Sequence, residues 1–189
     1  MGITDFQELK TSRLVLRRCC REDAGMYFAR LASSEAVTRY MLFSPHQCPE
    51  ESLASVEKSL KRYETGEALR WVLDLPGEGL IGVIDLLRFD WETGSCSFAY
   101  MLAEKFWGRG FGTEALRAVF GYAFENLGIW QIEADHMAEN PASGAVMRKA
   151  GMTYVRTDIA KYEKNGIVQD AHVYRITRQE WEAREENAK

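Results

Sequence analysis

Three glycines at alternate positions, Gly108, Gly110 and Gly112, separate an apolar run from an amphipathic segment. The apolar run, residues 95–102, predicts a buried strand, and the apolar positions of residues 113–127 recur with the period of a helix. Because glycine has no Cβ, such a loop can take left-handed conformations and let a ligand approach the backbone. The helix that follows begins with unpaired N–H groups and the positive end of its dipole. The stretch therefore predicts a phosphate-binding loop between a strand and a helix.

A further strand is predicted directly after this helix, and the order strand, helix, strand indicates a parallel pair with a right-handed crossover. The other strands follow one another through short turns, which indicates antiparallel pairing. The predicted strands are residues 12–18, 71–75, 80–86, 95–102, 130–137, 153–163 and 167–176, and the predicted helices begin near Asp23, Pro49, Thr113 and Pro141. The predicted fold class is α+β, with one mixed, mostly antiparallel sheet of about seven strands flanked by about four helices.

The C-terminal part of the chain carries a turn signal and a polar tail. Asn165-Gly166, between the last two predicted strands, is typical of a hairpin turn. The segment from Gln179 onward is charged apart from Trp181, so we expect it to fray. Neither a linker nor a repeat interrupts the sequence. We therefore expect a single domain over residues 1–189, with its core at about residues 12–181.

Composition and charge exclude several classes of function. The formal net charge of −4 argues against a nucleic-acid-binding protein, which needs a basic face. The four cysteines form no C-x-x-C pair, so we expect neither a disulfide framework nor a metal site, and a reducing cytoplasm is favoured. The sequence has no apolar run of transmembrane length and no signal core at its start, so we expect no membrane contact. A monomer and a homodimer are both open.

Residues 107–115 read Trp-Gly-Arg-Gly-Phe-Gly-Thr-Glu-Ala. They do not form the dinucleotide-binding motif, which would need a glycine in place of Thr113, and they do not form a P-loop. They resemble the acetyl-CoA-binding signature of the GNAT acyltransferase superfamily, Gln/Arg-x-x-Gly-x-Gly/Ala, with Trp107 in the first position. Residues 140–152 resemble the second signature of one branch, Asn-x-x-Ser followed by an apolar helix. That branch contains the ribosomal-protein alpha-amino (Rim-type) N-acetyltransferases.

The resemblance implies the GNAT fold, in which the strand before the glycine loop splays away from its parallel neighbour. It implies an enzyme that moves an acetyl group from acetyl-CoA directly to a primary amine. The first expected acceptor is the alpha-amine of a protein or peptide N-terminus. Two alternatives stay open. One is a small-molecule amine acceptor such as a polyamine, an amino acid or an antibiotic, and the other is a non-catalytic CoA-binding regulatory module.

The resemblance also implies which residues bind acetyl-CoA. The pyrophosphate is expected on the backbone N–H groups of residues 109–113, at the helix start. The pantetheine arm is expected to pair with the main chain of the preceding strand, where one N–H polarises the thioester carbonyl. The expected cofactor-binding residues are Met101, Leu102, Trp107, Arg109, Gly110, Phe111, Gly112, Thr113, Asn140 and Ser143.

The catalytic residues follow from two departures from the family pattern. Met147 stands where many GNAT enzymes have a tyrosine, so we predict that Ser143 is the hydrogen-bond donor or general acid to the CoA sulfur. A serine in a first helical turn can instead bond to local backbone. Ser97 stands where the branch often has a glutamate base. The remaining base candidates are Asp85, Glu133 and Asp135, each of which could instead lie on a solvated face.

The acceptor side of the site has no diagnostic motif. Residues 33–43 mix polar and aromatic side chains and are the expected acceptor-side segment. The histidines His46, His136 and His172 lack the spacing of a metal site. Several aromatic residues could either frame an acceptor pocket or belong to the core, namely Tyr40, Trp71, Trp91, Tyr100 and Trp107.

Overall fold

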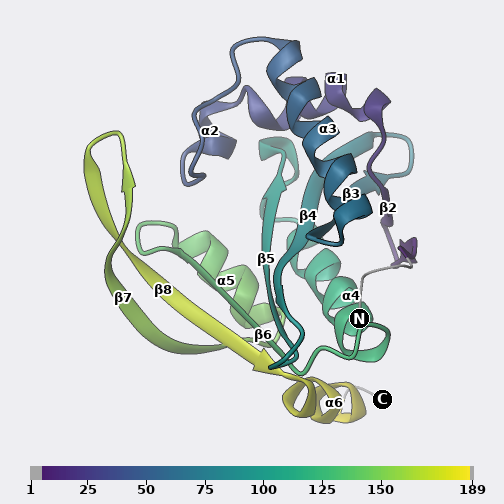
Figure 1. Cartoon of the computed structure of the whole chain (residues 1–189), viewed down its shortest axis with the longest axis vertical. Coiled ribbons are helices and arrows are strands. Elements are labelled where there is room, and N and C mark those ends of the chain that lie inside the picture. Colours follow the sequence, from purple (N-terminus) through teal and green to yellow (C-terminus); the bar gives the residue numbers. More distant parts are fainter. Residues whose placement is uncertain (1–5, 188–189) are drawn as a thin grey trace.

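The computed structural model describes residues 6–187 and contains one eight-stranded sheet (Figure 1), with the strand order β1-β2-β3-β4-β5-β6-β8-β7. The strands are β1 (Leu9–Lys10), β2 (Val15–Arg18), β3 (Ala68–Leu75), β4 (Gly79–Asp90), β5 (Ser95–Leu102), β6 (Gln131–Met137), β7 (Thr153–Lys164) and β8 (Ile167–Thr177). The α-helices are α1 (Ala24–Tyr27), α2 (Glu35–Thr38), α3 (Pro49–Thr65), α4 (Phe111–Glu125), α5 (Pro141–Lys149) and α6 (Arg178–Asn187). The predicted α+β class with a mostly antiparallel sheet is confirmed.

Two parts of the element prediction are wrong. The sheet has one strand more than predicted, because β1 contains only two residues and is too short to show a pattern in the sequence. The tail does not fray at Gln179 but forms α6, in which Trp181 is 6% exposed. The Trp181 ring lies 6.4 Å from the Phe120 ring and 6.1 Å from the Phe124 ring, between centroids. This burial on α4 offsets the polar composition of the tail.

The parallel pair β5–β6 separates soon after it forms. Its register partners are Ser95↔Gln131 and Cys96↔Ile132, whereas β5 stays paired with β4 as far as Leu102↔Gly82. Along β5 beyond Cys96, the main-chain groups on the β6 side therefore have no strand partner. This is the splayed pair that was predicted.

Helices cover both faces of the sheet. On β3, consecutive residues point to opposite faces. The Arg70 side chain lies near the ring of Tyr27, which belongs to α1, whereas the Trp71 ring packs against Tyr122 of α4 at 5.4 Å between centroids. Helices α1 and α3 therefore cover one face and α4 the other (Figure 1). The long hairpin β7–β8 extends beyond the helices, and its turn at Asn165-Gly166 is confirmed by φ values of 53° and 75°.

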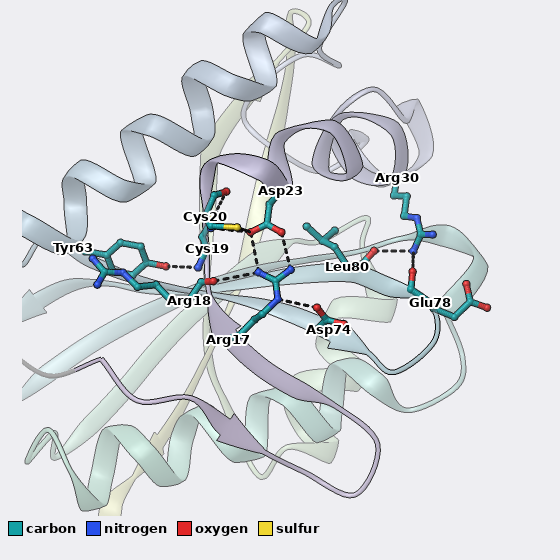
Figure 2. A network of polar contacts seen from close by, with 10 residues as sticks. All are labelled: Arg17, Arg18, Cys19, Cys20, Asp23, Arg30, Tyr63, Asp74, Glu78 and Leu80. Carbon is teal, nitrogen blue, oxygen red and sulfur yellow. Dashed lines mark hydrogen bonds and ion pairs between the residues drawn. The ribbon is translucent and has the colours of Figure 1, made fainter.

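Partly buried polar contacts attach the N-terminal helices to the sheet (Figure 2). The Arg17 guanidinium donates to Asp23 at 2.7 Å and to Asp74 of β3 at 2.8 Å. Burial alone would raise the pKa of Asp23, but the hydrogen bonds from Arg17 and from the Cys20 N–H lower it overall. Nearby, Arg30 donates to two main-chain carbonyls in the β3–β4 turn and at the start of β4. These contacts hold the N-terminal segment, which forms only short helices, against β3 and β4.

Candidate active site

The glycine loop lies at the C-terminal end of β5, and two of its glycines have backbone angles that favour glycine. Gly108 and Gly110 have φ values of 71° and 83°, in the left-handed region where a side chain would be strained. Gly112 lies inside α4, and a Cβ there would meet Val146 at 3.5 Å and Tyr100 at 3.6 Å. The first two glycines therefore shape the turn, and the third brings α4 close to both β5 and α5.

The first turn of α4 begins without a side-chain cap. Its first intrahelical bond runs from the Glu114 N–H to the Gly110 carbonyl at 3.0 Å. Gly110, the N-cap residue, has no side chain that could accept from the turn. Within residues 6–187, no acceptor faces the N–H groups of Phe111, Gly112 and Thr113. Three free N–H groups at the positive end of a 15-residue helix suit the oxygens of a phosphate.

Two arginines flank this turn, and the sequence indicated only one of them. Arg109 lies 5.3 Å from the centroid of the Phe111 ring and forms no ion pair with the described residues. Arg13, which the sequence did not indicate, lies 4.2 Å from the same ring and donates to the Arg109 carbonyl at 2.9 Å. Its Nε donates to Glu114 at 2.7 Å, and Thr11 donates to the same carboxylate at 2.6 Å. The N-terminal segment thus holds the loop in place through contacts between residues about 100 positions apart in the sequence.

Trp107 connects the loop to the end of β5. Its Nε1 donates to the Leu102 carbonyl at 2.6 Å, although the side chain is 46% exposed. The Ala103 N–H donates to Ile81 of β4 at 2.8 Å. Because bonding alternates along an antiparallel strand, Met101 also turns its main chain toward β4, while Tyr100 and Leu102 face the gap. Of the two predicted strand residues, Leu102 is therefore the one that presents its N–H to the splay.

The N-terminus of α5 meets β5 near this gap. Asn140 caps the helix, since its side-chain oxygen accepts the Ser143 N–H at 3.2 Å. Ser143 is buried, at 9% exposure, and its side chain lies close to the Tyr100 hydroxyl. Burial raises the pKa of Tyr100, and the nearby Ser143 side chain acts in the opposite direction. Two hydroxyl groups thus lie together at the splay. Tyr100 had been considered only as an aromatic wall or a core residue.

The carboxylates predicted as bases all have partners. Asp85 forms a bidentate ion pair with Arg70, at 2.7 Å to Nε and 2.9 Å to Nη2, and both residues are buried. Glu133 pairs with Arg156 at 3.0 Å. Asp135 pairs with Lys161 and also accepts from a tyrosine hydroxyl. Each predicted base is therefore part of an ion pair.

A cavity of about 280 Å³ opens beside the start of the splay. It is lined by β4, β5, β6, β7 and β8 through Arg88, Ser95, Cys96, Ser97, Gln131, Glu133, Ala134, Asp135, Lys161 and Val173. Two of the predicted carboxylates, Glu133 and Asp135, face it together with Ser97, whereas Asp85 does not. The cavity is large enough for part of a small acceptor.

Comparison with known proteins identifies this arrangement. The family model for the acetyltransferase (GNAT) domain matches residues 13–153. The chain belongs to the GNAT acetyltransferase family. This N-acetyltransferase is 27% identical over 174 residues to YoaA of Bacillus subtilis, an uncharacterized N-acetyltransferase, covering 92% of this chain and 98% of that relative.

Solved GNAT structures have the same fold. A spermidine N-acetyltransferase from Vibrio cholerae, in complex with CoA and spermine, has a TM-score of 0.80 at 22% identity, covering 90% of this chain and 99% of that one. RimL, a ribosomal L7/L12 alpha-N-protein acetyltransferase in complex with coenzyme A, has a TM-score of 0.83 at 19% identity, covering 90% and 98%. The suspected membership of the superfamily is confirmed, and Rim-type proteins are among the neighbours.

The described part of this GNAT enzyme contains no helix long and apolar enough to cross a membrane. It also brings together no group of three or more His, Cys, Asp and Glu side chains that could hold a metal ion. His136 is buried, with Nδ1 2.8 Å from the Met137 carbonyl, and burial lowers its pKa. Trp71 belongs to the core, since it is fully buried and donates to Gln7 at 2.9 Å.

The segment predicted to lie on the acceptor side, residues 33–43, is attached to the β7–β8 hairpin. The Lys164 ammonium group at the hairpin tip donates to the Thr38 carbonyl at 2.7 Å and to the Met41 carbonyl at 2.6 Å. Burial lowers the pKa of Lys164. The tip of the hairpin therefore contacts the α2 region.

A Gly144→Ala variant is expected to lose stability and activity together. The added Cβ would lie 2.6 Å from His136 Nε2 and 3.3 Å from the Tyr174 hydroxyl, so the first turn of α5 must shift. Overpacking of this kind costs about 1–3 kcal/mol, and it displaces Ser143. Gly121→Ala in α4 is the matched control, because its Cβ would meet Trp181 at an ordinary 3.5 Å. If thermal melts show the Gly144→Ala and Gly121→Ala variants to have equal melting temperatures, the close packing of α5 against His136 is contradicted.

Proposed function

We propose that this N-acetyltransferase uses acetyl-CoA to acetylate the alpha-amine of a protein or peptide N-terminus. One observation carries the proposal. The uncapped start of α4, the open edge of β5 and the buried Ser143 meet at the splay of one parallel pair. An extended donor needs these three partners in this order. Its phosphates need a helix N-terminus, its amides need the main chain of a strand edge, and its thioester needs a hydrogen-bond donor. Acetyl-CoA would supply the acetyl thioester that reacts.

Most of the predicted donor-binding groups have a task in this proposal, whereas Met101 turns its main chain toward β4. The N–H groups of residues 111–113 receive the pyrophosphate oxygens, and Arg109 adds a positive charge beside them. The Leu102 and Tyr100 N–H groups receive amide or thioester oxygens in the gap, where a fixed dipole stabilises developing negative charge. Trp107 and Asn140 act indirectly, because the first holds the end of β5 and the second caps α5.

The proton chemistry is assigned to the pair of hydroxyl groups. As the new C–N bond forms and the C–S bond breaks, Ser143 donates its proton to the leaving sulfur, and Tyr100 can pass a proton on to Ser143. The proton that the amine loses is taken up by a base or by water, so that amide and free CoA thiol are the products. The amine must attack in its neutral form. An alpha-amine titrates near 8 and a lysine amine near 10.4, so an alpha-amine needs less help from a base. Glu133 and Asp135 stay the base candidates that face the cavity.

Binding of acetyl-CoA is expected to raise the melting temperature. Ligand at about 100 times its Kd stabilises the folded protein by about 2.7 kcal/mol, or roughly 5–10 °C for a chain of this size. Differential scanning fluorimetry with acetyl-CoA, with NAD and with ATP measures this, and only the first should shift the melt. An unchanged melt with saturating acetyl-CoA would contradict the assignment of the loop.

A small-molecule amine is the second candidate acceptor. The cavity of about 280 Å³ favours it, because a space of that size suits a compact ligand, and a spermidine N-acetyltransferase is among the similar folds. A panel of peptide N-termini, lysine, polyamines and aminoglycosides, followed by the release of free CoA, separates the two candidates. A cytoplasmic location is also proposed, supported by four cysteines that are all free thiols.

A further inference from the structure

Strand β4 has a bulge at the cavity. The register of β4 with β5 moves from Leu87↔Ser97 to Asp90↔Ser95, so β4 has an extra residue there. Within the bulge Arg88 has a φ of 54°, in the left-handed region that side chains other than glycine rarely adopt. Bulges re-aim side chains, and a strained residue at one is a reason to look for a role. The bulge places Arg88 in the lining of the cavity.

Arg88 differs from the other charged residues around the cavity because it has no partner. Three carboxylates and two basic side chains pair with one another there: Glu133 with Arg156, Asp135 with Lys161, and Asp158 with both Arg156 and Lys161. Arg88 forms neither an ion pair nor a hydrogen bond with any of residues 6–187. A guanidinium with five donors in a rigid fork is suited to a carboxylate.

The position of Arg88 limits where that carboxylate lies on the acceptor. Ser97, beside the bulge, is three residues before Tyr100 on β5. At about 3.3 Å per residue, the bulge is roughly 10 Å along β5 from the main chain of Tyr100, whose N–H faces the gap. An extended peptide advances about 3.3–3.6 Å per residue, so this separation corresponds to a side chain within the first three residues of an acceptor. The alpha-carboxylate of a free amino acid would lie much closer to its own amine.

We propose that the acceptor is a peptide or protein N-terminus with an acidic side chain within its first three residues, and that Arg88 binds this side chain. The inference rests on the proposed function and makes it more specific. The paired carboxylates of the cavity lie on β6, across the gap from Arg88. These carboxylates already have counter-charges, whereas the positive charge of Arg88 is left for a group on the acceptor.

The experiment compares peptides that differ only in charge. Peptides of one length begin with Ser-Glu-Glu, Ser-Gln-Gln or Ser-Lys-Lys, and spermidine is the small polycation, with kcat/KM read from the release of free CoA. The wild type should prefer the acidic over the neutral peptide by about 10-fold or more, as one charge-assisted pair provides. Arg88→Gln should reduce this ratio to near 1, Arg88→Lys should keep part of it, and added salt should lower it in the wild type.

Arg21→Gln is the matched control, since Arg21 is an exposed arginine paired with Glu57 and does not line the cavity. It should keep the wild-type ratio, and the melting temperatures of both variants check that they fold. Equal rates with acidic and neutral peptides, or a preference that persists in Arg88→Gln, would overturn the role of Arg88 while leaving the proposed function intact. Faster turnover of spermidine than of every peptide would overturn the acceptor class. If none of these amines leads to release of free CoA, the proposed function itself is overturned.

Discussion

A Ser143→Ala variant is expected to lose about 100-fold or more in kcat, because general acid catalysis contributes roughly 10²–10⁴-fold. The variant loses the hydroxyl that we assign to the leaving sulfur. It should still bind acetyl-CoA, since the free N–H groups of α4 and the cap from Asn140 do not involve the Ser143 hydroxyl. Steady-state kinetics on an accepted amine and the acetyl-CoA melt shift, measured side by side, separate the two properties.

Tyr100→Phe is the informative companion to this variant. It removes the hydroxyl that lies close to Ser143 but keeps the ring against Gly112. A smaller loss than in Ser143→Ala, with no further loss in the double variant, is expected if Tyr100 acts through Ser143. A Ser143→Ala enzyme with the wild-type kcat would contradict the acid assignment. Additive losses would instead indicate that each hydroxyl contacts the reacting groups separately.

An Asp85→Leu variant is expected to lose about 3–5 kcal/mol of unfolding free energy, because it leaves a buried guanidinium without its counter-charge. Arg70 and Asp85 are each 9% exposed, and Arg70 Nη1 already has no hydrogen-bond partner. The ion pair raises the pKa of Arg70, although burial opposes this, so the guanidinium stays charged in the folded state. Denaturation in urea measures the loss, which is a large fraction of the stability of an ordinary domain.

The double variant Arg70→Met/Asp85→Leu tests the reason for that loss. Replacing both partners of a buried pair by apolar residues of similar volume is often neutral, so most of the stability should return. Glu78→Gln is the surface control, since it removes an exposed pair with Lys105 and should change stability little. If Asp85→Leu were as stable as Glu78→Gln, the Arg70–Asp85 pair would not be the structural contact that its burial indicates.

The sequence by itself determined the elements that depend on neighbouring residues. Asn140 and Pro141 begin α5 as predicted, Pro49 begins α3, and Asn165-Gly166 forms the hairpin turn. Gly108 and Gly110 have the left-handed angles that only glycine adopts without strain. Capping, turn formation and helical period act over a few residues, so a single sequence carries them. The same local information, with the resemblance of two motifs, predicted the fold and the family.

Only the tertiary structure decided which side chains meet. Arg13 and Glu114 are 101 residues apart, and no local pattern announces their contact. The bulge that aims Arg88 at the cavity depends on the register of β4 with β5. Asp85 was predicted as a possible base, and its pairing with Arg70 follows from their opposite positions on β3 and β4. Strand register and helix docking are set by the whole core, and they alone bring partners distant in sequence within hydrogen-bonding distance.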